Sequence, residues 1–301
     1  MHLREIKGKI DVTHGLSKIT RALELVSAVK MKRSQRFALG ARPFTQVVLE
    51  ILEKLEGYPQ AIKKSVYFQK RSIDKTLAVV ISSDKGFCAA FNKNILNFAR
   101  KSIKKLNNVE IFAVGKKAGK FFQKEGYPVL VEFSGIGDYG KIEDTRAIAD
   151  KILDYFRKGR FQEIFLYYTD FVSSFTQRPK EIQLLPLDMK IIKETLKHYQ
   201  LKNAAKPESP LPLGRKYHTL LEPSPKEIFE ALVPRLVAYL IHHSILEANA
   251  SEHSARMMAM RRANENAEDV LRRLTLEYNK ARQAQITAEV CEIGTAKEAT
   301  N

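Results

Sequence analysis

The sequence has 301 residues, of which 44% are hydrophobic, so it can hold one large domain or two modest domains with real cores. Its 51 basic and 34 acidic residues give a net charge of +17, and residues 57–225 carry +13 of it. A basic surface of this kind suits nucleic acid, anionic lipid or acidic protein partners, and composition alone does not choose among them.

Several classes of protein are excluded at this stage. Cys88 and Cys291 lie far apart in the sequence, which argues against a disulfide-stabilised domain and for a reducing compartment. No apolar run reaches membrane-spanning length, and the N-terminus begins with a charged amphipathic pattern instead of a signal peptide. We therefore expect a soluble cytoplasmic protein.

Residues 3–56 are predicted to form one long helix. Apolar side chains recur at three- and four-residue steps in three runs: Leu3, Ile6 and Ile10; Leu16, Ile19, Leu23 and Val26; and Phe37, Ala41, Phe44, Val48, Ile51 and Leu55. Three glycines and a proline lower the intrinsic helix propensity of this stretch, so we expect a packing partner to hold it. A basic cluster around Met31 is either a solvated face or a contact for an acidic partner loop.

Residues 57–224 are different, because β-rich apolar runs alternate there with helical patterns. We expect strands over residues 77–81, 111–114, 129–133 and 164–169, helices over 92–106, 116–125 and 142–158, and a candidate edge strand over 181–186. This alternation predicts a Rossmann-like α/β domain whose mostly parallel sheet is covered on both faces. Five of the eleven prolines fall within residues 207–225, which we interpret as a return linker.

The last domain, residues 225–301, is predicted to be a second long helix and a tail. Ser224, Pro225 and Glu227 mark its start, Gly294 marks its stop, and the helix over residues 226–293 would be about 100 Å long. From Met260 a narrow seam of small or apolar positions recurs at coiled-coil spacing: Ala263, Ala267, Val270, Leu274, Tyr278 and Ala281. Two long helices at opposite ends of one chain predict an antiparallel coiled coil.

Two glycine motifs suggest nucleotide binding, but neither matches the full pattern of a nucleotide-binding site. Residues 135–140 read G-x-G-x-x-G, but they follow the third predicted strand instead of the first, and the acid expected after a second strand is missing. Residues 115–120 resemble a phosphate-binding loop with one residue too few and Phe121 in place of Ser or Thr. We expect no cofactor and no metal site. A dinucleotide-dependent enzyme and a basic nucleic-acid-binding scaffold remain the alternatives.

Four stretches resemble the gamma subunit of the rotary F-type ATP synthase in its bacterial form. These are scattered positions over residues 6–31, the turn SDKGFCAAFN at 83–92, ASEHSARMMAM at 250–260 and YNKARQAQIT at 278–287. The resemblance covers both predicted long helices and most of the α/β domain. It implies a non-catalytic rotor shaft, with ATP chemistry on the beta subunits of a surrounding alpha–beta hexamer.

The resemblance also implies partners, a location and contact residues. The partners would be the alpha, beta and epsilon subunits and the membrane ring of c subunits, at the cytoplasmic face of the bacterial inner membrane, with no nucleic acid and no direct membrane insertion. The contacts with the beta subunits would come from Lys30, Arg33, Arg256, Arg282, Gln283 and Thr287. The contacts of the foot with the rotor ring and epsilon would come from Tyr217 and Glu222.

Overall fold

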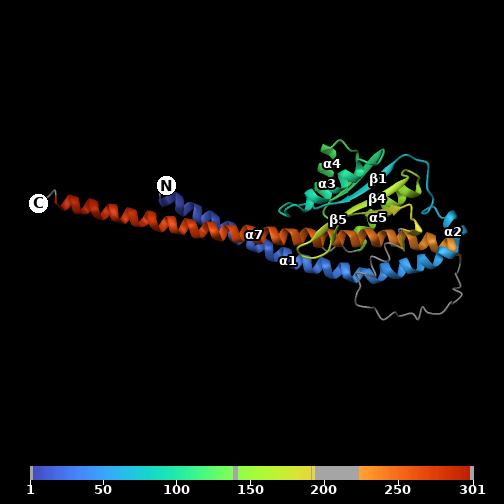
Figure 1. Ribbon diagram of the computed structural model, residues 1–301, viewed down its shortest axis with the longest axis horizontal. Coiled ribbons are helices and arrows are strands. Elements are labelled where there is room, and N and C mark those ends of the chain that lie inside the picture. Colours follow the sequence, from blue (N-terminus) through green and yellow to red (C-terminus); the bar gives the residue numbers. More distant parts are fainter. Residues whose placement is uncertain (1–2, 138–141, 191, 194–223, 299–301) are drawn as a thin grey trace. The chain divides into compact units, whose positions relative to one another are not determined.

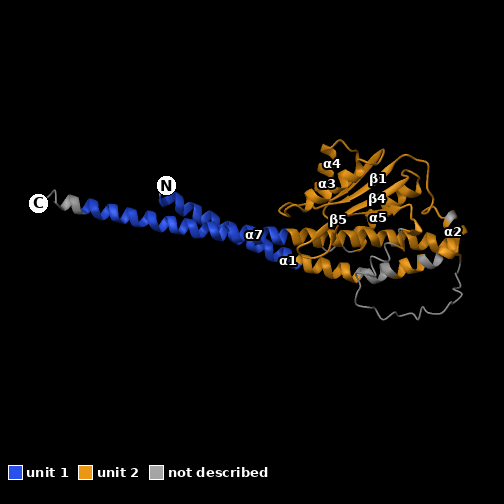
Figure 2. Cartoon of the chain, viewed as in Figure 1, with its two compact units in different colours: residues 1–29, 256–301 blue, residues 30–255 orange. Residues whose placement is uncertain are grey.

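The computed structural model describes residues 3–137, 142–190, 192–193 and 224–298 (Figure 1). The chain divides into two compact units, unit 1 with residues 1–29 and 256–301 and unit 2 with residues 30–255 (Figure 2). Helices α1 (Leu3–Lys54) and α7 (Pro225–Glu298) each run through both units. The boundaries at residues 56 and 224 that the sequence suggests stay a prediction.

Helix α7 is 74 residues long and begins where the sequence predicts. The backbone N–H of Glu227 donates to Ser224 Oγ over 3.3 Å, and the Ser224 hydroxyl donates to the Glu227 carboxylate over 3.1 Å. This satisfies one of the N–H groups that lack a partner in the first turn of a helix. The predicted stop at Gly294 is wrong, because the helix continues to Glu298. A glycine weakens a helix by about 1 kcal/mol relative to alanine and does not by itself end it.

Helix α1 is 52 residues long and is followed by a short 3-10 turn, Leu55–Gly57. The predicted helix over residues 3–56 is confirmed to within two residues at its end. A six-residue helix, α2 (Pro59–Lys64), comes next, and the sequence analysis did not anticipate it.

The middle of the chain forms a five-stranded sheet in the order β3-β2-β1-β4-β5. Its strands are β1 (Thr76–Ile81), β2 (Val109–Val114), β3 (Val129–Phe133), β4 (Glu163–Phe171) and β5 (Gln177–Leu185). The first four are parallel to their neighbours, and β5 pairs antiparallel with β4 at the edge. The four predicted strands and the candidate edge strand are therefore confirmed, as is the α/β class.

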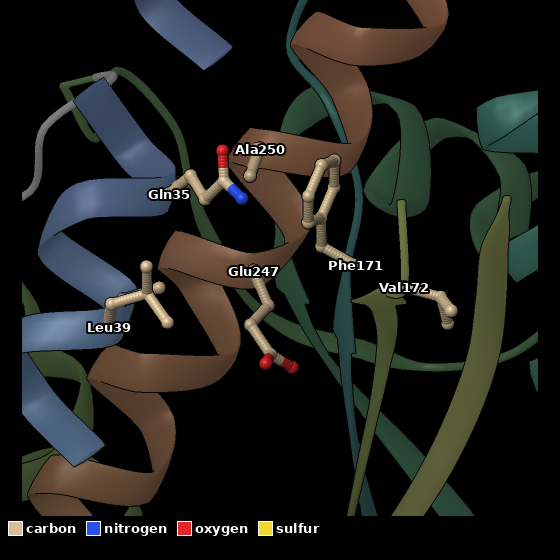
Figure 3. A pocket seen from close by; sticks show the side chains of 7 residues that line it. Gln35, Leu39, Phe171, Val172, Glu247 and Ala250 are labelled. Carbon is tan, nitrogen blue, oxygen red and sulfur yellow. The ribbon is translucent and has the colours of Figure 1, made fainter. Parts of the chain in front are cut away.

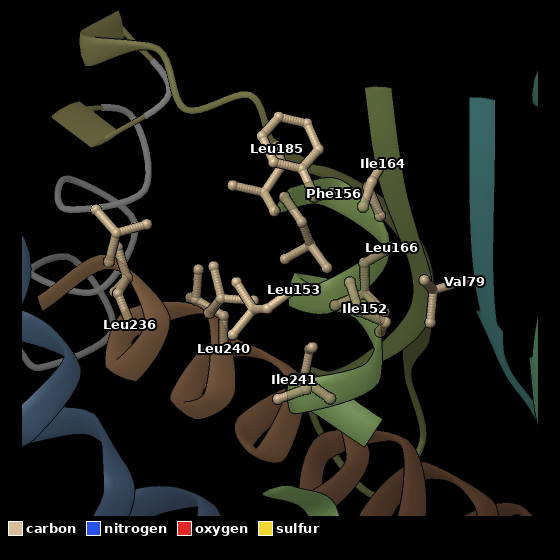
Figure 4. Packing of buried hydrophobic residues seen from close by; sticks show 14 of the residues in the cluster. Val79, Ile152, Leu153, Phe156, Ile164, Leu166, Leu185, Leu236, Leu240 and Ile241 are labelled. Carbon is tan, nitrogen blue, oxygen red and sulfur yellow. The ribbon is translucent and has the colours of Figure 1, made fainter. Parts of the chain in front are cut away.

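Helices cover both faces of this sheet (Figure 1). On one face, α3 (Phe91–Ile103) and α4 (Lys116–Lys124) bury Ile95 and Phe122 against alternate residues of β1 and β2. On the other face, α5 (Ile142–Arg157) and the part of α7 in unit 2 form the larger core. The α5–α7 contact joins Ile152 and Leu153 to Leu240 and Ile241, as Figure 4 shows. Because the centre of the sheet is buried on both faces, β1 and β2 read as nearly continuous apolar runs.

No apolar run of membrane-spanning length is expected from the sequence. Judged by length and composition alone, this prediction is wrong. An 18-residue window within residues 225–293 of α7 passes that test, and 56% of the window is buried inside the chain. A helix that packs in the core of an α/β domain has this composition for the same reason as a membrane span, namely that it lacks contact with water. Cys88 is buried and Cys291 is exposed.

Candidate functional site: the junction between the long helices and the sheet

The carboxyl ends of the first three strands are tied together by one carboxylate. Asp84, in the loop after β1, accepts hydrogen bonds from the backbone N–H of Lys116 over 2.9 Å and of Gly135 over 2.8 Å. These two residues begin the segments that follow β2 and β3. A side chain with two acceptor oxygens thus fixes three loops at the edge where an open α/β sheet usually binds its ligand.

The two glycine motifs have structural explanations at this edge. Gly115 has a φ of +99°, and a Cβ there would lie 2.2 Å from the carbonyl oxygen of Ser82. A side chain is therefore excluded because the β2–α4 turn passes directly over the end of β1. Of the second motif, Gly135 has a φ of +75° and donates to Asp84, and residues 138–140 lie outside the described part of the chain.

The strand order reverses direction between β1 and β4, and α7 occupies this position. Ala255 of α7 is buried in a small apolar cluster with Cys88 and Phe91 from the segment after β1. Ser251, one turn earlier, directs its hydroxyl to the carbonyl oxygen of Thr169 near the end of β4 over 3.4 Å. In a doubly wound enzyme the crevice at this switch point holds the ligand. Here the C-terminal helix fills it.

The hairpin between β4 and β5 holds α7 from the side. The Ser254 hydroxyl donates to the carbonyl oxygen of Ser174 over 2.6 Å, and the Gln177 amide lies 3.5 Å from Ser254 Oγ. Ser251 and Ser254 are both completely buried. Buried hydroxyls need partners to offset their desolvation, so these two serines fix both the rotation and the axial position of α7 against the hairpin.

Helix α1 reaches the same hairpin. The hydroxyl of Ser174 lies 3.8 Å from the sulfur of Met31, and Ser34 and Ala38 are buried one and two turns further along α1. Small residues at these positions let a helix backbone approach its neighbours closely. We define the junction as Met31, Ser174, Gln177, Ser251 and Ser254 together with the Cys88–Phe91–Ala255 cluster. It brings α1, α7 and both loops at the switch point into one contact.

Two buried histidines lie on α7, on the N-terminal side of the junction. His242 Nδ1 lies 3.0 Å from the hydroxyl of Thr145 on α5, and burial lowers the pKa of His242 below its ordinary value of 6.5, with Glu143 opposing that shift. His243 and Glu247 form a fully buried pair one turn apart, with Nε2 and Oε1 3.6 Å apart. The neutral form of His242 is therefore favoured where α5 and α7 meet.

A cavity of about 300 Å³ adjoins this pair (Figure 3). Its lining consists of Gln35, Ala38 and Leu39 of α1, Phe171 and Val172 at the end of β4, and Glu247 and Ala250 of α7. It contains one carboxylate and no nucleophile with an adjacent base, so its walls do not form the arrangement needed for acyl or phosphoryl transfer. Within the described residues there is also no group of three or more His, Cys, Asp or Glu side chains that could hold a metal ion.

Unit 1 pairs the two helices through a polar seam. Asn264, only 6% exposed, accepts a hydrogen bond from the Ser17 hydroxyl over 2.9 Å and lies 3.5 Å from Thr20 Oγ1. Buried or half-buried positions on α7 then recur at coiled-coil spacing, including the predicted Ala267, Leu274, Tyr278 and Ala281. Val270 is the exception, since it is 42% exposed.

Of the predicted apolar face of α1 in unit 1, the first run, with Ile6 buried and Leu3 and Ile10 half-buried, faces inward as predicted, and the second run is wrong. Leu16, Ile19, Leu23 and Val26 are between 37% and 59% exposed, whereas the buried or half-buried positions are Thr13, Ser17, Thr20 and Ser27. Both sets recur at three- and four-residue steps. The helix therefore carries two stripes, and periodicity alone does not tell which of them faces the partner helix. The apolar stripe is the outward one.

The predicted contact residues are spread over both units. In unit 2, Lys30 is half-buried and Arg33 is exposed, with its guanidinium carbon 5.8 Å from the ring centre of Phe37. In unit 1, Arg256 is only 9% exposed. Arg282, Gln283 and Thr287 are exposed, and the Thr287 hydroxyl donates to the carbonyl oxygen of Gln283 over 2.9 Å. Tyr217 and Glu222 lie outside the described residues.

The junction serines were not among the predicted site residues. Ser251 and Ser254 lie three residues apart on α7, and this spacing puts two hydroxyls on one face. That signal was present in the sequence. Their partners are backbone carbonyls of the hairpin, and a sequence does not show which carbonyl a hydroxyl will meet.

These features define a class of protein. The position where an α/β sheet would bind a small ligand is filled by a helix, and the long helices are held to the domain by buried hydroxyls and small residues. Unit 2 is therefore an α/β domain built around segments of two long helices, without the open crevice of a doubly wound enzyme.

The chain matches the family described as ATP synthase over residues 2–300. It is 36% identical to the ATP synthase gamma chain of Roseiflexus castenholzii, with 98% of this chain and 97% of that protein covered. The identity to the ATP synthase gamma chain of Chloroflexus aurantiacus is 34%, with 98% of each covered. The chain therefore belongs to the ATP synthase gamma chain family.

Solved structures share the fold. The chain aligns with a TM-score of 0.61 and 18% identity to a chain in the mitochondrial ATP synthase of Euglena gracilis (OSCP/F1/c-ring), covering 99% of this chain and 94% of that one. The TM-score is 0.60, with 23% identity, for a chain in the central stalk and c-ring of the Tetrahymena thermophila mitochondrial enzyme, covering 81% and 99%. Long terminal helices around a mostly parallel sheet are thus an arrangement that ATP synthase stalks contain.

Proposed function

We propose that this chain is the central rotor shaft of an F-type ATP synthase. The shaft couples ion-driven rotation of a membrane ring to conformational change in catalytic beta subunits, which make or hydrolyse ATP. The chain itself carries no catalytic step. Family membership supports this function, and the similar solved structures include an ATP synthase central stalk and a rotor.

The observation that carries the proposal is the outward apolar stripe of α1 in unit 1. Leu16, Ile19 and Val26 are each at least half exposed, and at this level of α1 the side turned to α7 carries Ser17 and Thr20, which meet Asn264. A helix that covers its polar side with its partner and leaves its apolar side outside is stable in water only at a cost. A surrounding protein sleeve removes that cost.

An apolar outer surface also suits rotation. Contacts between apolar groups are non-directional, so the sleeve can change its partner residues without breaking oriented hydrogen bonds. The polar contacts then need to be few. We assign them to Lys30, Arg33 and Arg256 against acidic loops of the beta subunits, and to Arg282, Gln283 and Thr287 nearer the C-terminal end of α7.

A rotor must also pass torque between its globular part and its helices. In unit 2 this is the role of the junction, where buried Ser251 and Ser254 bond the sheet edge and the hairpin. A sliding apolar contact at this place would let α7 turn without the domain. Directional hydrogen bonds resist such rotation.

The partners follow from the proposed role. They are the alpha and beta subunits, with one shaft per hexamer, the epsilon subunit and the c-subunit ring, and Tyr217 and Glu222 are proposed to face the last two. The assembly is associated with a membrane, and we place it on the cytoplasmic face of a bacterial inner membrane. The chain is peripheral there, because the apolar window of α7 is largely used for its own core.

Reconstitution tests the proposal. The full chain is mixed with alpha and beta subunits of the same organism, the assembly is isolated, and its ATP hydrolysis is compared with the mixture that lacks this chain. We expect one copy per hexamer and hydrolysis that depends on it. A chain that stays apart from the hexamer and leaves hydrolysis unchanged would refute the proposal.

A further inference from the structure

The outer surface of α3 and α4 in unit 2 carries an unusual density of lysine. Nine lysines in the segment from the β1–α3 loop to the end of α4 are all exposed: Lys85, Lys93, Lys101, Lys104, Lys105, Lys116, Lys117, Lys120 and Lys124. We call this set the lysine face. Both helices lie on the same side of the sheet (Figure 1).

Helical spacing directs these lysines away from the sheet. In α3 the buried positions are Phe91, Ile95, Leu96, Ala99 and Ile103, and Lys93, Lys101 and Lys104 lie on the opposite side. In α4 the buried positions are Ala118, Gly119 and Phe122, and Lys117, Lys120 and Lys124 lie outside them. One apolar side of each helix is thus used by the core, and one cationic side is left to solvent.

The charge is not balanced inside the chain. Two carboxylates from the sheet reach these helices, Glu132 beside Gly119 and Glu181 at Ser102, and residues 84–125 still hold ten basic against three acidic residues of their own. All three acids have partners other than the nine lysines: Asp84 accepts from two backbone N–H groups, Glu110 pairs with Lys75 and Arg160, and Glu125 pairs with Arg100. No ion pair of the lysine face occurs within the described part of the chain.

Helix α5, on the other side of the sheet, provides the contrast. It carries four acidic and three basic residues. Arg146 lies 3.9 Å from Asp150, one helical turn away, and Asp154 lies 2.8 Å from Lys158 just beyond the helix. Charge on a solvated helix of this domain is therefore mixed and locally paired, as expected for a surface selected only for solubility. The lysine face departs from that arrangement.

We propose that the lysine face binds the anionic headgroup surface of a lipid bilayer. The chemistry favours lipid over a protein partner, since stable protein interfaces are depleted in lysine and enriched in aromatics and arginine. Arg100, the one arginine of α3, is already paired and stacked near Phe121. Compact, strongly hydrated ammonium groups suit attraction to a phosphate-rich plane without fixed stoichiometry. Phe98, 36% exposed among the lysines, adds an aromatic group of the kind found at membrane interfaces.

This inference goes beyond the shaft role and does not depend on it. An attraction spread over nine charges has no preferred orientation around an axis normal to the membrane, so it is also compatible with a chain that turns. Its strength falls with ionic strength, because exposed charges are screened.

Vesicle co-sedimentation of the full-length chain tests the proposal. The probes are vesicles of phosphatidylcholine alone and of phosphatidylcholine with phosphatidylglycerol, each at low and high salt. We expect binding to the anionic vesicles only, lost at high salt. The charge-reversal variant Lys101→Glu, Lys104→Glu, Lys117→Glu, Lys120→Glu should weaken partitioning by at least about 600-fold, since each of the four cations near an anionic surface contributes about fivefold.

The matched control reverses the same number of charges elsewhere, with Lys7→Glu, Lys18→Glu, Lys64→Glu and Lys70→Glu, all exposed. It should keep most of the binding. Equal losses of vesicle binding in both variants would show that binding depends only on the net charge of the chain, and would overturn the proposal. So would equal binding to neutral vesicles, or binding of DNA or polyglutamate without vesicle binding. The variant of the lysine face should still assemble with alpha and beta subunits. A failure of the proposed shaft role would instead be seen when the unmodified chain is reconstituted with those subunits.

Discussion

Asn264 of α7 and Ser17 of α1 are joined by a 2.9 Å hydrogen bond at the centre of the helix pair in unit 1. Asn264 also donates to Glu268 over 2.8 Å, so both ends of its amide are used. A buried asparagine in a coiled-coil seam stabilises less than an apolar residue would, and its best-attested role is to fix the register of the helices. This pair explains how two helices whose seam holds many small residues keep a defined alignment.

A double-mutant cycle on this pair measures its contribution. We expect Ser17→Ala and Asn264→Ala each to lower the free energy of unfolding by about 1 kcal/mol, and the double variant to cost less than their sum by about 1 kcal/mol. Denaturant unfolding of the full chain provides the numbers. Glu265→Ala, on the exposed side of the same helix, is the control and should stay within about 0.5 kcal/mol. Strict additivity of the two changes would show that the hydrogen bond contributes nothing.

The small residues of the seam set the distance between the helices. Ala267 is only 5% exposed, whereas Ala284, further along the same helix, is exposed. Ala267→Phe should therefore overpack the seam and destabilise the chain by about 1 to 3 kcal/mol. Ala284→Phe makes the same substitution on the outside and should leave thermal stability of the isolated chain nearly unchanged. Similar losses in the two variants would mean that the assigned seam is incorrect.

The α/β domain could be predicted from its sequence because local and tertiary signals agree there. The run Thr76–Ile81 is β-branched or apolar throughout and buried along its whole length, so the pattern and the environment coincide. The turn that follows this strand and contains Asp84 is also predicted by the sequence. Its role in tying three strand ends was not predictable, since its partners Lys116 and Gly135 are distant in sequence and offer only backbone N–H groups.

The long helices show where sequence reasoning stops. Periodicity predicted α1 and gave its limits, but it assigned Leu16 and Ile19 to the inside. A stripe of apolar residues indicates that something covers it, and a single sequence does not say whether that cover is another part of the chain or another protein. The buried stripe with Ser17 and Thr20 was overlooked because hydroxyl residues are usually scored as solvent-facing.

The outward stripe gives a prediction that separates folding from assembly. Ile19 is 59% exposed, so Ile19→Asp should change the free energy of unfolding of the isolated chain by less than about 0.5 kcal/mol. In the reconstituted hexamer the same variant should weaken assembly and lower ATP hydrolysis, because a charge then enters an apolar contact. Lys18→Asp, at the adjacent exposed position, tests whether any new acid has this effect. Unimpaired assembly of the Ile19 variant would remove the main support for a sleeve around α1.

The buried imidazole of His242 predicts how stability depends on pH. Burial lowers the pKa of His242 in the folded chain below its ordinary value of 6.5, so between the two values the unfolded chain binds more protons than the folded chain. The free energy of unfolding should therefore decrease as pH falls below about 6.5 and should not change through this group at higher pH. Thermal melts across this range measure the effect.

The variant His242→Gln separates this histidine from the other titrating groups. Glutamine keeps a polar group near Thr145 and does not titrate, so the melting temperature of the variant should fall less steeply with acid than that of the unmodified chain. The exposed His14 is the control, because His14→Gln should leave the pH dependence as it is. If His242→Gln and the unmodified chain lose stability in parallel, another group controls the acid sensitivity. In that case the His243–Glu247 pair, buried one turn apart on the same helix, is the next to test.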